Sequence, residues 1–216
     1  MAPSAAWLLA VAGLLAAFDA RAQQPRQEPD WGNAPRERRS GLVVGLGLGG
    51  ALGGASGYPN DAMKIDREQY HTVIGVAAGG GGSLWLGAAP CDWLTLGLGG
   101  SGGVMEGEGH QVAFFAGALR LEAFPAWSLG GYYRELGTFM ESGIGFVEAR
   151  AEGGGTVLPI DSGGAASRLG VGVFYEGIRL WRLSMGPYAM FDEMWSASAS
   201  RPALWLGWRT ALYTGP

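Results

Sequence analysis

Apolar and small residues alternate at a period of two along most of this chain. In the stretch 41–52, aliphatic residues hold one parity and glycine holds most positions of the other. The aliphatic residues there are Leu42, Val44, Leu46, Leu48 and Leu52. The stretch 81–100 repeats the pattern on both sides of a turn at 90–93. Because successive side chains of a strand point to opposite faces, this alternation predicts β-strands with a leucine face and a glycine-rich face.

The same pattern predicts about eight strands, joined by connections that alternate between long and short. The expected strands are 41–52, 71–88, 93–102, 110–123, 137–150, 167–178, 183–195 and 202–213. Long loops are expected at 53–70, 103–109, 151–166 and 196–201, and turns at 89–92, 124–136 and 179–182. Proline cannot donate to a strand ladder, so Pro187 predicts a bulge or local kink in the seventh strand.

The leucine face and its glycine-rich partner favour lipid outside and a narrow lumen inside. A soluble sheet that buries leucine normally carries Lys, Glu or Thr on its other face. Only 16% of the residues are charged, against roughly 25% in soluble domains. Beyond residue 22, no apolar run approaches the roughly 20 residues of a membrane helix. We therefore expect an all-β, up-and-down antiparallel transmembrane β-barrel.

The amino-terminal part of the chain predicts export. Residues 1–22 read as a cleaved signal peptide, with an apolar core at 7–18 and an A-x-A site at 20–22. Residues 23–40 are rich in proline and charge and predict a disordered periplasmic lead-in. Its arginines, Arg36, Arg38 and Arg39, are expected in a solvated tail, with anionic headgroups or cell-wall polymer as alternative contacts. Residues 41–216 would then form the barrel.

Charge and cysteine content exclude several functions. The net charge is −4, and nothing in it indicates a nucleic-acid partner. Cys91 is the single cysteine, so neither an intramolecular disulfide nor a cysteine-based metal site is possible. We expect no cofactor and no metal.

Charged residues of both signs fall on the lumen-facing parity. Unpaired buried charge is costly, so these residues should pair and fill the lumen, with a gated ion path as the alternative. The lumen ion-pair candidates are Arg120, Glu122, Glu141, Arg168, Glu176, Asp192 and Arg209.

Aromatic residues gather near the predicted strand ends. There they are typical of the girdles that barrels place at membrane interfaces, and a carbohydrate-binding role is the alternative. The girdle candidates are Trp93, Trp127, Tyr132, Tyr133, Trp181, Trp195 and Tyr213.

The two histidines, His71 and His110, both fall at the start of a predicted strand that follows a long loop, near Asp61, Asp66 and the acidic residues of 103–109. Solvated histidines at the loop ends are the simpler interpretation, since His-x-Ser spacing is absent. A metal site or a lipid-modifying hydrolase site is the alternative. No catalytic residue is assigned.

The leader, the strand alternation, the loop lengths and the final strand 203–213 together resemble the small eight-stranded outer-membrane barrels of the OmpA/OmpX type. This resemblance implies a Gram-negative outer membrane, contact with its lipid and lipopolysaccharide, and insertion by the barrel-assembly machinery. It implies a structural or surface-interaction role through extracellular loops, without a wide pore and without enzymatic activity; the extracellular partner stays unknown. The alternatives are a lipid A-modifying barrel enzyme and a secreted lipocalin-like binder of apolar ligands.

Overall fold

The computed structural model describes residues 39–59, 61–129, 131–151, 156–158 and 166–215. The predicted signal peptide and lead-in lie outside these residues, except for Arg39 and Ser40. Of the part described, no helix is long and apolar enough to cross a membrane.

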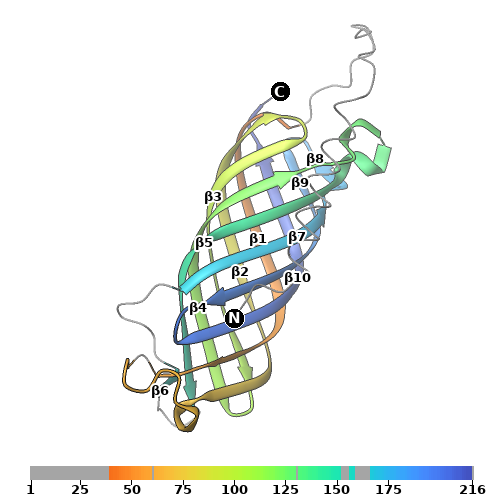
Figure 1. Ribbon diagram of the computed structural model, residues 1–216. Coiled ribbons are helices and arrows are strands. Elements are labelled where there is room, and N and C mark those ends of the chain that lie inside the picture. Colours follow the sequence, from red (N-terminus) through yellow and green to blue (C-terminus); the bar gives the residue numbers. More distant parts are fainter. Residues whose placement is uncertain (1–38, 60, 130, 152–155, 159–165, 216) are drawn as a thin grey trace, which may run out of the picture. The chain divides into compact units, whose positions relative to one another are not determined.

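Eight long antiparallel strands form a closed barrel (Figure 1). Each pairs with its neighbours along the chain, and the last strand pairs with both the one before it and the first. These strands are β1 Gly41–Gly57, β2 Thr72–Cys91, β3 Leu94–Gly107, β4 His110–Ala123, β5 Leu136–Ala151, β7 Ala166–Tyr175, β9 Leu183–Trp195 and β10 Ala199–Tyr213. The predicted fold class, an all-β up-and-down antiparallel barrel of eight strands, is confirmed.

Short elements complete the two ends of the barrel. The terminal end, where β1 begins and β10 finishes, carries the 3₁₀ helices η2 Trp127–Leu129 and η3 Gly131–Glu135 and the short strand β8 Ile178–Leu180, which pairs with β9. The opposite, loop end carries η1 Glu68–Tyr70 and β6 Thr156–Leu158, which pairs with β5.

Two of the predicted long loops are wrong, because strand pairing continues through polar sequence. β3 and β4 pair out to Gly107 and His110, so only Glu108 and Gly109 form the turn. Within that extension the Gln111 amide donates to Glu106 Oε1 at 2.9 Å. Likewise β10 already begins at Ala199, three residues before the predicted start. Polar side chains do not end an antiparallel ladder, since the backbone supplies its hydrogen bonds.

The predicted irregularity at Pro187 falls in a neighbouring strand. β9 passes through Pro187 with unbroken register against β10, where Pro187 lies opposite Trp208. On the other side, β7 ends at Tyr175 and pairing with β9 resumes only at Ile178 in β8. The break lies opposite the proline, which has no N–H to donate.

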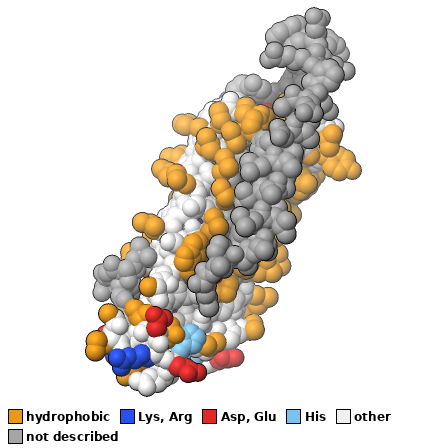
Figure 2. Space-filling model, in the orientation of Figure 1, with side chains coloured by type: hydrophobic (Ala, Val, Ile, Leu, Met, Phe, Trp, Pro, Cys, Tyr) orange, Lys and Arg blue, Asp and Glu red, His pale blue; other side chains and the backbone are white. Residues whose placement is uncertain are grey.

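Hydrophobic side chains stand out along the visible face of the wall (Figure 2). Most leucines of the outward parity are exposed; Leu48 is 59% exposed and Leu98 is 65% exposed. The large side chains of the inward parity, such as Trp85, Phe174 and Trp205, are buried. The predicted assignment of leucine to the outside is thus confirmed, and the glycine-rich parity faces the lumen.

Glycine faces the lumen because aromatic rings lie across it. Five rings each lie over the glycine directly opposite on the neighbouring strand, where an added Cβ would come within 3.0 Å of the ring. The pairs are Trp85 with Gly45, Phe114 with Gly103, Phe139 with Gly172, Phe174 with Gly137 and Tyr188 with Gly207. Only glycine leaves room for a ring that lies flat on the opposing backbone.

Candidate functional site

A chain of alternating arginines and carboxylates fills the lumen. Each of its twelve members is at most 8% exposed, and its six positive and six negative charges cancel. We call this set the lumen ladder: Arg39, Asp92, Arg120, Glu122, Arg134, Glu135, Glu141, Arg168, Glu176, Asp192, Arg201 and Arg209.

The lumen ladder begins at the terminal end of the barrel. There Arg134 pairs with Asp92, and Arg39 reaches both Asp92 and Glu135. Arg39 Nε lies 3.5 Å from Glu176 Oε2. These five side chains close the terminal mouth, and none of them belongs to a wall strand.

The middle of the ladder connects β10, β4 and β5. Arg209 joins Glu176 to Glu122, with nitrogen–oxygen distances of 2.9 Å to each. Arg120 Nε lies 2.7 Å from Glu122 Oε1, and its Nη1 pairs with Glu141. Every carboxylate here is shared by two arginines, so none is left as an unpaired buried charge.

The ladder ends below the loop end of the barrel. Arg168 Nη2 lies 2.7 Å from Glu141 Oε2, and its Nε lies 3.1 Å from Asp192 Oδ2. Arg201 Nη2 lies 2.6 Å from the same oxygen, and the indole of Trp205 donates to Asp192 Oδ1 at 2.9 Å. Ion pairs therefore run without interruption from Arg134 to Arg201.

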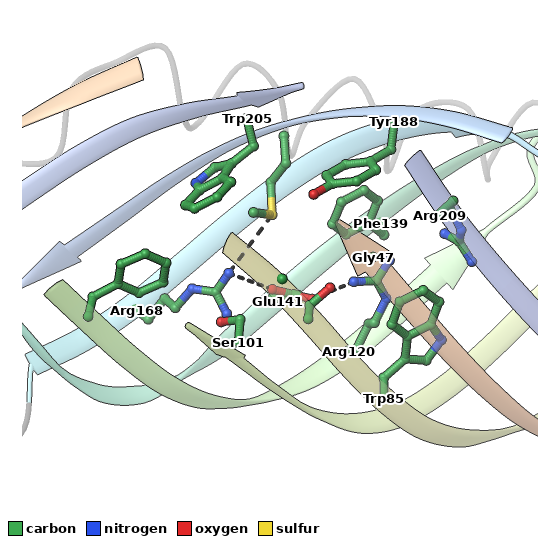
Figure 3. Close-up of a pocket in the computed structure, with 14 residues that line it drawn as sticks. Gly47, Trp85, Ser101, Arg120, Phe139, Glu141, Arg168, Tyr188, Trp205 and Arg209 are labelled. Atoms are coloured by element: carbon green, nitrogen blue, oxygen red, sulfur yellow. Dashed lines mark hydrogen bonds and ion pairs between the residues drawn. The ribbon is translucent and has the colours of Figure 1, made fainter. Parts of the chain in front are cut away.

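Aromatic rings support the guanidinium groups of the ladder. The Arg120 guanidinium carbon lies 4.2 Å from the centre of the Trp85 ring and 4.1 Å from that of Phe139 (Figure 3). Arg209 lies 3.7 Å from the centre of Phe174. Such contacts attract cations to the ring face and are strongest away from water.

The ladder leaves little free space. The central cavity has a volume of about 20 Å³, which is about the space of one water molecule. Ser101, Tyr188 and Glu141 lie on its wall (Figure 3). The Ser101 hydroxyl and the Trp85 indole N–H are buried and have no hydrogen-bond partner in the protein. Both groups therefore suit a hydrogen bond to a water molecule in the cavity.

The structure brings together all seven lumen candidates from the sequence, and five further members of the ladder were missed. Arg201 has the same parity as Arg209, but the predicted strand began one residue too late to include it. Arg39 was expected in a solvated tail, yet it is fully buried. Asp92 lies in a turn and Arg134 and Glu135 lie in η3, where no strand parity exists to indicate their direction.

The girdle candidates separate into three groups. Trp181, Tyr132, Tyr133 and Trp195 are exposed, at 90%, 83%, 66% and 41%. Trp93 and Trp127 are half-buried against the apolar core inside the barrel. The predicted place of Tyr213 in the girdle is wrong. Its side chain lies in the lumen, is 3% exposed, and donates its hydroxyl hydrogen bond to Glu176 at 3.1 Å. Tyr213 shares the parity of Arg209, and that parity points inward.

The two histidines have separate surroundings. The His71 ring lies 4.9 Å from that of Tyr58, and His110 Nδ1 contacts the Glu108 carbonyl oxygen at 2.8 Å. These contacts do not form a histidine–serine–carboxylate arrangement. Within the described part of the chain, no three His, Cys, Asp or Glu side chains are placed to hold a metal ion.

No family model matches the chain, and no curated protein matches it in sequence. Solved structures with a similar fold include Neisserial surface protein A (NspA), with a TM-score of 0.47 and 10% identity over 80% of this chain and 97% of that chain. The attachment invasion locus protein Ail of Yersinia pestis has a TM-score of 0.43 and 9% identity over 79% and 99%. The outer membrane protein OprG from Pseudomonas aeruginosa has a TM-score of 0.43 and 11% identity over 82% and 98%.

The distribution of side chains gives the location of the barrel. Exposed leucine, valine and isoleucine side chains lie on the outer face of the wall and the twelve charges of the lumen ladder lie inside, which is the arrangement of strands that cross a lipid bilayer. Closed barrels of this kind lie in bacterial outer membranes, so the predicted outer-membrane location is confirmed. The lipocalin-like alternative is wrong, because it requires the leucine face to line the inside of the barrel.

Proposed function

We propose that this chain is an outer-membrane barrel with a structural or surface-interaction role, and that its lumen is closed to ions and small solutes. The observation that carries this proposal is the unbroken lumen ladder from Arg134 to Arg201. An open channel needs a continuous column of water, whereas here ion pairs and rings occupy the axis.

Opening the lumen would require separating buried charges. Eight strands enclose an interior that side chains fill. Glu141 becomes unpaired only when both Arg120 and Arg168 move aside, and removing one partner of a buried ion pair costs roughly 3–5 kcal/mol. A path for hydrated ions needs several such separations together. The ladder thus holds the barrel both rigid and closed.

The terminal end is proposed to face the periplasm, since an exported chain with an even strand count keeps both ends there. The loop end then faces outward and carries the surface role. In the connection between β1 and β2, Met63 is 69% exposed, and the Lys64 ammonium lies 5.7 Å from the centre of the Tyr70 ring. Asp61 organises this loop by accepting the Met63 backbone N–H at 2.9 Å and pairing with Lys64 at 3.5 Å.

Planar-bilayer recording tests the closed lumen. The purified barrel, inserted at low density, should show no unitary current steps, and liposomes that contain it should not swell in small sugars. A porin that is purified and inserted in the same way serves as the positive control for insertion. Stable current steps from the unmodified protein would refute the closed lumen.

Loop replacement tests the surface role. Replacing residues 59–70 by a short Gly-Ser linker should leave heat-modifiable gel migration unchanged, because the barrel wall is untouched. Intact cells with the shortened loop should lose autoaggregation or surface adhesion relative to cells with the full loop at equal surface amounts. Equal behaviour of the two strains in both assays would contradict a role for this loop.

A further inference from the structure

Arg39, the residue two positions before the first strand, is folded into the mouth of the barrel. Its side chain is fully buried and its guanidinium lies 3.5 Å from the centre of the Phe124 ring. It pairs with Glu135 and, at 3.5 Å, with Glu176, and its backbone N–H donates to Asp92 Oδ1 at 3.0 Å. A residue of a polar lead-in thus has four separate contacts inside the barrel.

A glycine turn directs Arg39 into the mouth. Gly41 has a φ of 77°, in the left-handed region that favours glycine. A Cβ on Gly41 would lie 2.7 Å from Thr214 Oγ1 and 2.9 Å from the Gly215 nitrogen. Any other residue at this position would therefore be strained in its backbone and would collide with the end of the chain.

The same turn is fastened to the carboxyl-terminal residues. The Gly215 N–H donates to the Ser40 carbonyl at 2.9 Å. The Thr214 N–H donates to the Leu42 carbonyl at 2.9 Å, and the Leu42 N–H donates to Thr214 Oγ1 at 2.8 Å. These bonds lie at the seam between β1 and β10, where the barrel closes on itself.

Glu176 connects Arg39 to the last strand. Besides Arg39, Glu176 binds Arg209 at 2.9 Å and accepts the Tyr213 hydroxyl at 3.1 Å, and both of these residues belong to β10. The residues on either side of the seam therefore share one carboxylate, which is itself fully buried.

We propose that Arg39 is a latch that closes the terminal mouth and locks the seam between the first and last strands. Its partners come from three different connections, those between β2 and β3, β4 and β5, and β7 and β8. The latch can seat only after all three have reached their places, so it secures the completed barrel. The latch proposal does not depend on the proposed function, because the middle of the lumen ladder closes the lumen even when Arg39 is absent.

The single cysteine of the chain provides the assay. Cys91 is half-buried at the end of β2 and directly precedes Asp92, a partner of Arg39. Arg39→Gln should speed maleimide labelling of Cys91 in the folded barrel by about tenfold or more and shift urea unfolding to lower concentrations, because a buried ion-pair partner is lost. Arg38→Gln, which removes the same charge one residue earlier, is the matched control and should change neither.

A second variant releases the latch without changing charge. Gly41→Ala should give the same faster labelling, since the turn can no longer direct Arg39 inward, and it provides the test should Arg39→Gln not fold. Arg39→Lys should be intermediate, because an ammonium keeps the charge but loses the planar contact with Phe124. Unchanged labelling in folded Arg39→Gln or Gly41→Ala, or an equal effect of Arg38→Gln, would overturn the latch. Current steps in the unmodified protein would instead refute only the closed lumen.

Discussion

Replacing Gly45 by alanine is expected to destabilise the barrel, although glycine inside a strand is normally the poorer residue by roughly 0.5–1 kcal/mol. In β1, a Cβ at this position would come within 3.0 Å of three atoms of the Trp85 indole, Cε2, Cζ2 and Nε1. The ring is 2% exposed, and the cavity that it lines has a volume of only about 20 Å³. Alanine at Gly45 therefore displaces Trp85.

The size of the effect follows from what Trp85 supports. Overpacking a filled interior costs roughly 1–3 kcal/mol. The Trp85 ring also contacts the guanidinium groups of Arg120, at 4.2 Å, and Arg209, at 4.9 Å, and such contacts contribute about 2 kcal/mol when they are desolvated. Allowing for the better strand propensity of alanine, we expect a net loss of about 2–4 kcal/mol in the free energy of unfolding.

Urea unfolding in detergent micelles measures this loss through the folded, heat-modifiable gel band. Gly117→Ala is the matched control, because Gly117 lies on the outward parity and the nearest atom to an added Cβ, the Gly99 carbonyl oxygen, is 3.9 Å away. It should stabilise the barrel by roughly 0.5–1 kcal/mol, the ordinary gain when alanine replaces glycine in a strand without a clash. The double variant Gly45→Ala with Trp85→Leu should recover part of the lost stability, because leucine is smaller than the indole and leaves room for the new Cβ. If Gly45→Ala is as stable as Gly117→Ala, the ring does not require the glycine.

Three further outcomes test the ladder, the loop and the histidines. Glu141→Ala should cost about 3–5 kcal/mol in the same urea assay, since it removes the carboxylate shared by two buried arginines; a loss below about 1 kcal/mol would contradict a cooperative ladder. The Met63 N–H bond, with help from Lys64, lowers the pKa of Asp61 below the ordinary 3.8, so this contact is present at neutral pH and lost only as pH falls through the lowered value. The Met63 amide shift should therefore titrate with a midpoint below 3.8, and a midpoint above it would refute the contact. His71→Ala and His110→Ala should leave the lipid A profile by mass spectrometry unchanged, and an altered profile would favour the enzyme alternative.

Most of the wall could be predicted from the sequence because strand parity carries two kinds of information at once. Leucine at one parity indicates the lipid face, so the charged residues of the other parity had to lie inside. For Arg120, Arg168 and Asp192 this reasoning needs no knowledge of which strand lies beside which. Ion pairing then follows from the cost of burying a charge alone.

The residues that sequence reasoning misplaced are those for which parity was absent or was given too little weight. Arg39 precedes the first strand, and its burial depends on a glycine turn and on partners from three distant connections. Tyr213 was assigned to the interface from its place at the end of the last predicted strand, although its parity with Arg209 already indicated the lumen. Where position and parity disagree within a strand, parity decides, since a one-residue change reverses the face.

The glycines explain how an eight-stranded barrel accommodates six buried arginines. A guanidinium group stacked on a ring needs that ring to lie across the lumen, and the ring lies across it only where the opposing residue has no side chain. Gly45 beneath Trp85 and Gly172 beneath Phe139 produce this arrangement on the two sides of Arg120. The carboxylates then hold the guanidinium groups in line along the axis. Leucine therefore makes the outer face suited to lipid, and glycine leaves the space in which aromatic rings and ion pairs fill the lumen.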